Sequence, residues 1–174
     1  MNSVNIESII NNPSIIVLAV VLVDIFAMIL ARNNLAGKVI NDWYNQFTLG
    51  AFVADVSSIC FGIFLSLCLF KFVFPKDSFT LLNFIISVVI IQVIHDLLFS
   101  VVIKSYPAKS NKMMDLFKGY VNENSWKILL VDASMMILSV IIIWIFANYK
   151  VVDTAIIYTL LAFSLYFAQF LIYS

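Results

Sequence analysis

The chain has 174 residues, of which 63% are hydrophobic and 11% are charged, and its formal net charge is zero. Soluble domains average about 45–50% apolar and about 25% charged residues, so this composition excludes the soluble globular class and makes the lipid bilayer the expected partner. A chain without excess positive charge offers no basic surface to phosphates, so no nucleic acid partner is expected.

Five apolar stretches are long enough to cross the hydrocarbon as helices, which takes about 20 residues. In chain order they are residues 14–31, 48–74, 79–103, 126–148 and 154–173. Because lipid offers no partners to backbone N–H and C=O groups, each stretch is predicted to be an α-helix. The sequence therefore predicts an all-α, polytopic membrane bundle of about five transmembrane helices, with residues 1–174 as a single domain.

Two connecting segments have the character of the membrane interface. Loop 105–125 carries apolar residues at helical spacing with charged residues between them, which predicts a short amphipathic helix lying in the interface. The alternative is a solvated connector. In segment 39–47, Trp43 and Tyr44 are interpreted as interfacial aromatic residues.

The distribution of lysine and arginine predicts the orientation, because cytoplasmic loops carry the excess of positive charge. One side of the predicted bundle has seven basic residues: Arg32, Lys38, Lys104, Lys109, Lys112, Lys118 and Lys127. The other side has three: Lys71, Lys76 and Lys150. The N-terminus is therefore predicted outside and the C-terminus inside.

Four aspartates fall within the predicted spans, where each costs about 2.5–3.5 kcal/mol on insertion scales. They are Asp24, Asp55, Asp96 and Asp132, and the one histidine of the chain, His95, adjoins the third. Counted from the cytoplasmic helix ends at about 1.5 Å per residue, all four lie roughly 8–13 Å deep. The sequence therefore predicts one layer of carboxyl groups shared by four helices.

Each predicted helix has a polar or small-residue face that is expected to point inward. On helix 48–74, Ala51, Ser58, Gly62 and Ser66 lie on the face of Asp55 and are predicted helix-packing residues. Gln92 shares the face of His95 and Asp96, and the last helix is expected to contribute Gln169 beside Thr159 and Tyr166.

Three functions compete for this layer, since four unpaired charges cannot coexist in a low dielectric. The favoured hypothesis is a transporter or channel for protons or small cations, with these residues as the ion- or proton-binding set: Asp24, Asp55, Gln92, His95, Asp96, Asp132 and Gln169. The alternative is a structural or assembly protein of a membrane, whose aspartates are neutral hydrogen-bonding links between helices. Third comes a metal-dependent intramembrane enzyme acting on lipid.

The enzyme hypothesis has the least support. A catalytic zinc site usually needs two or three His or Cys ligands, and His95 is the one histidine present. We therefore expect no metal site and no cofactor, and we assign no catalytic residue. A bundle of this size leaves little room for a solute path, so transport would require a homo-oligomer.

Four short runs carry a resemblance to a known group of proteins. They are Asn41-Asp42-Trp43-Tyr44, Ala54-Asp55-Val56, Ile94-His95-Asp96-Leu97-Leu98-Phe99 and Asn111-Lys112-Met113-Met114-Asp115. Together they resemble small multi-spanning membrane proteins of large DNA viruses of algae and protists. That group has no assigned chemistry to carry over, and the resemblance implies residence in a host internal membrane or a viral inner membrane.

Overall fold

The computed structural model describes residues 4–35, 38–75, 78–149 and 154–173. These residues form helices and no strand: α1 (Ile6–Ile10), α2 (Pro13–Arg32), α3 (Lys38–Phe47), α4 (Leu49–Phe72), α5 (Leu81–Ser105), α6 (Lys112–Asn148) and α7 (Thr154–Ile172). Five helical stretches are long and apolar enough to cross a membrane: α2, α4, α5, Leu129–Asn148 of α6, and Ala155–Ile172 of α7. The predicted all-α fold with five apolar spans is confirmed.

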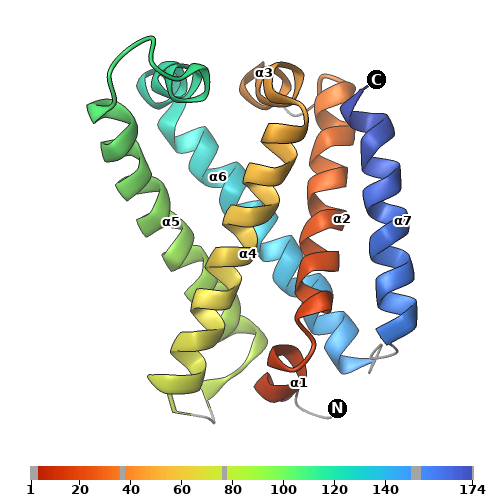
Figure 1. The fold of residues 1–174 in the computed structure, drawn as a ribbon. Helices are drawn as coiled ribbons and strands as arrows, with labels where there is room; N and C mark the ends of the chain where they lie inside the picture. The colour runs from red at the N-terminus through yellow and green to blue at the C-terminus, as the bar shows by residue number, and fades with distance from the viewer. Residues whose placement is uncertain (1–3, 36–37, 76–77, 150–153, 174) are drawn as a thin grey trace.

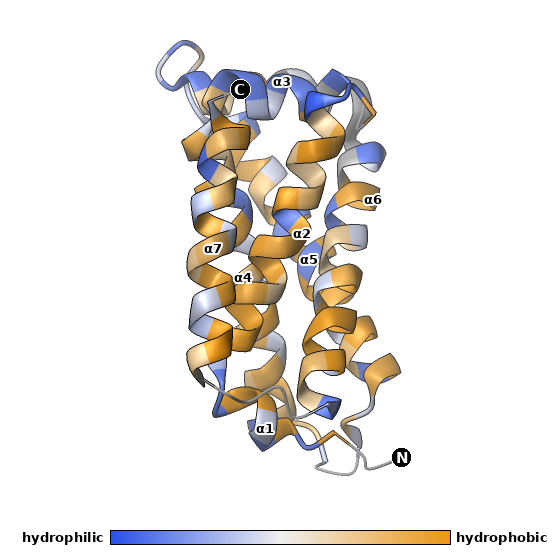
Figure 2. Cartoon of the chain, turned by 90° about the vertical axis from the view of Figure 1, so that its right-hand side faces the viewer, coloured by the Kyte–Doolittle hydropathy of each residue, from blue (hydrophilic) through white to orange (hydrophobic). Residues whose placement is uncertain are grey.

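The five spans run alternately up and down, and short helical segments lie at both ends of the bundle (Figure 1). Helix α3 and the first turns of α6 lie across the end where α2 and α7 finish, which we name the α3 end. Helix α1 lies at the opposite end, named the α1 end. Hydrophilic residues gather on α3 and around it, whereas the spans are mainly hydrophobic (Figure 2).

The segment predicted as a separate amphipathic helix belongs to a longer helix. Helix α6 begins at Lys112 and continues for 37 residues into the fourth span. The Asn111 side chain caps it by accepting from the backbone N–H groups of Met113 and Met114. No proline interrupts the sequence after that cap, so nothing ends the helix before the membrane is crossed.

Helices α3 and α4 are separated by a single residue. Thr48 has φ 45° and ψ −115°, a conformation outside the helical region, so the chain changes direction there. The amphipathic α3 can therefore lie across the end of the bundle while α4 descends through it. This turn places the side chains of α3 directly above the first turns of α4.

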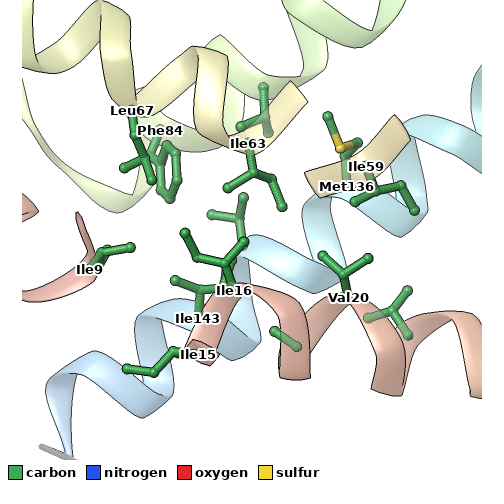
Figure 3. Packing of buried hydrophobic residues seen from close by; sticks show 14 of the residues in the cluster. Ile9, Ile15, Ile16, Val20, Ile59, Ile63, Leu67, Phe84, Met136 and Ile143 are labelled. Atoms are coloured by element: carbon green, nitrogen blue, oxygen red, sulfur yellow. The ribbon is translucent and has the colours of Figure 1, made fainter. Parts of the chain in front are cut away.

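Helix α2 is the centre of the bundle and packs against α1, α3, α4, α6 and α7. Its first half forms the apolar core toward the α1 end, together with residues of α1, α4, α5 and α6 (Figure 3). The residues labelled in that view are Ile9, Ile15, Ile16, Val20, Ile59, Ile63, Leu67, Phe84, Met136 and Ile143. This layer is mainly apolar, with Ser66 of α4 and Ser139 of α6 as buried polar residues.

The small-residue face of α4 lies against other helices. Ala51, Gly62 and Ser66 are buried and Ser58 is partly buried. A Cβ atom at Gly62 would overlap the terminal methyl group of Met136 on α6. Ser66 Oγ donates to Ser87 Oγ of α5 over 2.8 Å, so small and hydroxyl residues join these helices closely.

Arg32, the last residue of α2, forms hydrogen bonds with the C-terminal end of α7. Its Nε and Nη2 atoms donate to the carbonyl oxygens of Leu171 and Ile172, both over 2.9 Å. Its Nη1 atom donates to Asn45 Oδ1 of α3 over 2.9 Å. The final carbonyl groups of a helix lack partners within the helix, and the guanidinium group supplies them here.

Candidate functional site

Helices α2, α3 and α4 bring two aspartates and two aromatic residues into one hydrogen-bonded network. The Tyr44 hydroxyl lies 2.6 Å from Asp24 Oδ1 and 2.9 Å from Asp55 Oδ2. Trp43 Nε1 donates to the same Asp55 oxygen over 2.9 Å. Asp24 is fully buried and Tyr44 is 2% exposed. We name these four residues the α2–α3–α4 network.

Counting hydrogens favours a protonated carboxyl group in this network. Burial, together with the nearby carboxyl groups of Asp55 and Asp24, raises the pKa of Tyr44 well above its usual value, so the phenol keeps its hydrogen. That single hydrogen can serve one of the two carboxyl oxygens. The other contact then needs a hydrogen on the carboxyl group itself, because two acceptors cannot share a hydrogen bond without one.

The distribution of donors places this proton on Asp24. Asp55 Oδ2 receives the Trp43 indole N–H as well as the tyrosine contact, and two donors favour a negative charge there. Asp24 has no other donor, since its buried Oδ2 has no hydrogen-bond partner among the described residues. The resulting order is Asp24 donating to Tyr44 and Tyr44 donating to Asp55.

A second polar group lies on α5. Gln92 Nε2 donates to Asp96 Oδ1 over 2.7 Å, and His95 Nδ1 lies 3.1 Å from the same oxygen. The other oxygen, Asp96 Oδ2, is buried without a partner in the described part of the chain. The His95 side chain is 40% exposed, so this group connects a buried carboxyl group with the surroundings of the bundle.

Asp132 of α6 links the two groups electrostatically. It lies close enough to Asp96 and to Asp55 for their charges to interact, and Asp55 is related in the same way to Asp24. We name the four carboxyl groups the carboxyl row, in the order of these interactions: Asp24, Asp55, Asp132 and Asp96. Each comes from a different helix.

Aromatic side chains cover this row toward the α3 end. Trp43 packs against Phe47 of α3 and Phe117 of α6, with ring centroids 5.2 and 4.8 Å apart. Phe117 meets Phe99 of α5 at 5.7 Å, and Phe99 stacks on His95 at 5.8 Å. We name Trp43, Phe47, Phe99 and Phe117 the aromatic cover.

The apolar core lies on the other side of the carboxyl row, toward the α1 end. One helical turn toward the α1 end from Asp24, Asp55, Gln92 and Asp132 lies a buried apolar residue in each case: Val20, Ile59, Val88 and Met136 respectively. The carboxyl row therefore lies between the aromatic cover and the apolar core, and its Asp96 end is partly exposed beside His95. Among the described residues no cluster of three His, Cys, Asp or Glu side chains is placed to hold a metal ion.

One predicted site residue lies elsewhere. The inward face of α7 consists of Ile157, Ser164, Ala168 and Ile172, which are buried against α2. Gln169 is exposed and lies about 100° round the helix from Ala168, so this structure does not bring the predicted site residue Gln169 to the carboxyl row. The two small residues of this inward face, Ser164 and Ala168, allow α7 to approach α2 closely.

Two site residues were missed by the sequence analysis. Trp43 and Tyr44 were interpreted as interfacial aromatics, whereas both are buried and bind Asp55. Buried tyrosine and tryptophan usually find a partner for their polar atom, and an aspartate in the next predicted helix was available as that partner. No protein-family model, curated protein or solved structure matches this chain.

Proposed function

We propose that this integral membrane protein binds and transfers protons in the α2–α3–α4 network, as part of proton or small-cation transport. The observation that supports the proposal is the Tyr44 hydroxyl in contact with two carboxyl groups. A tyrosine between a carboxylic acid and a carboxylate can accept a proton from the acid while it donates its own hydrogen to the carboxylate. The tyrosine is a neutral phenol before and after this transfer. A purely structural link between helices needs no such shared proton.

The transfer step follows from the hydrogen-bond order. Asp24 gives its proton to the Tyr44 oxygen while Tyr44 gives its own hydrogen to Asp55. The negative charge moves from Asp55 to Asp24, and the phenol is neutral before and after. Because the raised pKa of Tyr44 makes a free phenolate unfavourable, the two transfers occur together.

From Asp55, the row continues through Asp132 to Asp96 and His95. The imidazole touches Asp96 with one ring nitrogen and is partly exposed, so it forms the outer end of the proposed path. A neutral imidazole accepts a proton on one nitrogen and donates from the other, which suits a residue at the entry or exit.

The orientation that we propose follows the positive charge. The α3 end carries the basic residues at the ends of α2 and α5 and around the starts of α3 and α6, so it is assigned to the cytoplasmic side, with the N-terminus outside. Helix α3 and the first turns of α6 then lie in the interface. Because the apolar core closes the other side, transport requires a second conformation or a homo-oligomer.

The proposal is tested by flux into proteoliposomes under an imposed pH or cation gradient. Wild-type protein should exceed empty vesicles, and Asp55→Asn should abolish the flux while the protein stays folded, because an amide accepts the same hydrogen bonds without taking up a proton. The network makes Asp24→Asn equally severe, although its helix face is otherwise apolar. Wild-type flux equal to that of empty vesicles would refute transport.

A structural or assembly role is the second candidate, and the apolar core favours it. Buried apolar residues lie one turn toward the α1 end from Asp24, Asp55 and Asp132, and two turns from Asp96, so the described part of the chain is mainly apolar on that side of the row. If the carboxyl groups only link helices, the Asp→Asn variants should remain folded and should show the same flux as the wild-type protein. Loss of flux with retained folding distinguishes transport from this alternative.

A further inference from the structure

An open cavity lies between α3 and the start of α6; it shares Phe47 with the aromatic cover, and no residue of the carboxyl row lines it. Its volume is about 460 Å³, and it is lined by Gln46, Phe47, Lys112, Asp115 and Leu116. The volume lies within the about 300–1,000 Å³ typical of small-ligand sites. Two of its lining residues, Phe47 and Leu116, are apolar, and the other three carry an ammonium, a carboxylate and an amide group.

The two charged groups of the cavity are not paired with each other. Lys112 and Asp115 are one helical turn apart, yet the His95–Asp96 contact is the one ion pair among the described residues. Both oxygens of Asp115 instead accept from the backbone N–H of Lys109, each over 3.1 Å. The Asn111 side chain already caps the first N–H groups of α6, so a ligand would meet side chains rather than a bare helix end.

The position of the cavity indicates what surrounds it. Both helices that line it lie across the α3 end, beyond the apolar spans and within the hydrophilic zone (Figures 1 and 2). In a bilayer this depth belongs to the lipid headgroups.

We propose that this cavity binds the zwitterionic headgroup of a phospholipid. The Lys112 ammonium meets the phosphate, the Asp115 carboxylate meets the positively charged amine, and Phe47 and Leu116 contact the start of the acyl chains. Lys112 and Asp115 carry opposite charges one helical turn apart, which matches a headgroup with one positive and one negative group. An anionic headgroup would be repelled by the Asp115 carboxylate. This site is independent of proton transfer in the carboxyl row.

The test is native mass spectrometry of delipidated full-length protein titrated with phosphatidylethanolamine, phosphatidylcholine and phosphatidylglycerol. Wild-type protein should prefer the two zwitterionic lipids. Lys112→Ala should weaken their binding by about tenfold or more, as expected for loss of a charge-assisted contact. Asp115→Asn retains an acceptor for Lys109 N–H and should shift the preference toward phosphatidylglycerol.

Lys104→Ala is the matched control, because this lysine lies at the same end of the bundle but does not line the cavity. Equal loss in Lys112→Ala and Lys104→Ala, or a wild-type preference for phosphatidylglycerol, would overturn the proposal. Displacement of the lipid by glycerophosphoethanolamine or inorganic phosphate at comparable concentration would assign the cavity to a soluble ligand instead. Asp55→Asn should leave lipid binding unchanged, which separates this test from the flux assay.

Discussion

The hydroxyl group of Tyr44 bridges Asp24 and Asp55, at 2.6 and 2.9 Å from one oxygen of each. Neither aspartate is near the other in sequence, and the tyrosine that joins them belongs to a helix outside the spans. The bridge ties α3 to the two central spans. Any change in the protonation of the pair therefore acts on the contact between α3 and the rest of the bundle.

Tyr44→Phe removes this bridge without changing the size of the ring. Asp24 Oδ1 then loses its partner in a buried place, so we expect the free energy of unfolding to fall by about 1–3 kcal/mol. Proton flux should fall by about tenfold or more, as for loss of a general acid–base group. Tyr158→Phe on the exposed face of α7 is the control and should change neither quantity. Unaltered flux in Tyr44→Phe would exclude the relay.

Phe117→Ala should open the aromatic cover. This ring packs on Trp43 at 4.8 Å, so its removal should expose the indole to water-borne quenchers. The measurement is acrylamide quenching of Trp43 fluorescence in protein that also carries Trp126→Phe and Trp144→Phe. Phe163→Ala, on an exposed face of α7, should leave the quenching unchanged. Strong quenching of Trp43 with Phe117 intact would contradict a closed cover.

Gly62→Leu tests the packing of α4 on α6. A leucine there overlaps Met136, and overpacking of this kind costs about 1–3 kcal/mol of stability. Gly62→Ala should be milder, because the overlapping atom is the terminal methyl group of a flexible methionine. Leu65→Val, on an exposed face of the same helix, should be nearly neutral in a thermal or denaturant unfolding assay. Similar losses in Gly62→Leu and Leu65→Val would contradict this packing.

The orientation can be tested with single cysteines in a variant that lacks Cys60 and Cys68. Asn148→Cys, near the α1 end, should react with a membrane-impermeant maleimide added outside intact cells. Ser110→Cys, in the exposed turn before α6, should react after permeabilisation and not before. The reverse pattern would invert the proposed topology.

The fold could be predicted from the sequence because a segment that spans lipid can adopt only a few backbone structures. Length and continuous apolarity located all five spans, and the helical repeat gave the packing side of α4. The continuity of α6 was less predictable, since the polar residues around 122–125 marked an apparent end to the apolar run. A helix needs no apolar face to continue through such residues once its backbone hydrogen bonds are formed.

The site was predictable in part for the same physical reason. Aspartates are costly in lipid, so Asp24, Asp55, Asp96 and Asp132 stood out and their depths agreed. The partner residues Trp43 and Tyr44 did not stand out, because aromatic residues near a helix end are common at membrane interfaces. Their role depends on the turn at Thr48, a tertiary feature that periodicity does not encode.

Infrared spectroscopy of the reconstituted protein at neutral pH tests the shared proton most directly, because a protonated carboxyl group has its own carbonyl stretching band. We expect one such band, from Asp24, to disappear in Asp24→Asn and to shift in frequency in Asp55→Asn, because the second substitution removes the carboxylate to which Tyr44 donates. Asp96→Asn should leave this band in place. A wild-type spectrum without a protonated-carboxyl band, or a spectrum whose bands are all unchanged in Asp24→Asn, would contradict a protonated Asp24 that is linked through Tyr44 to Asp55.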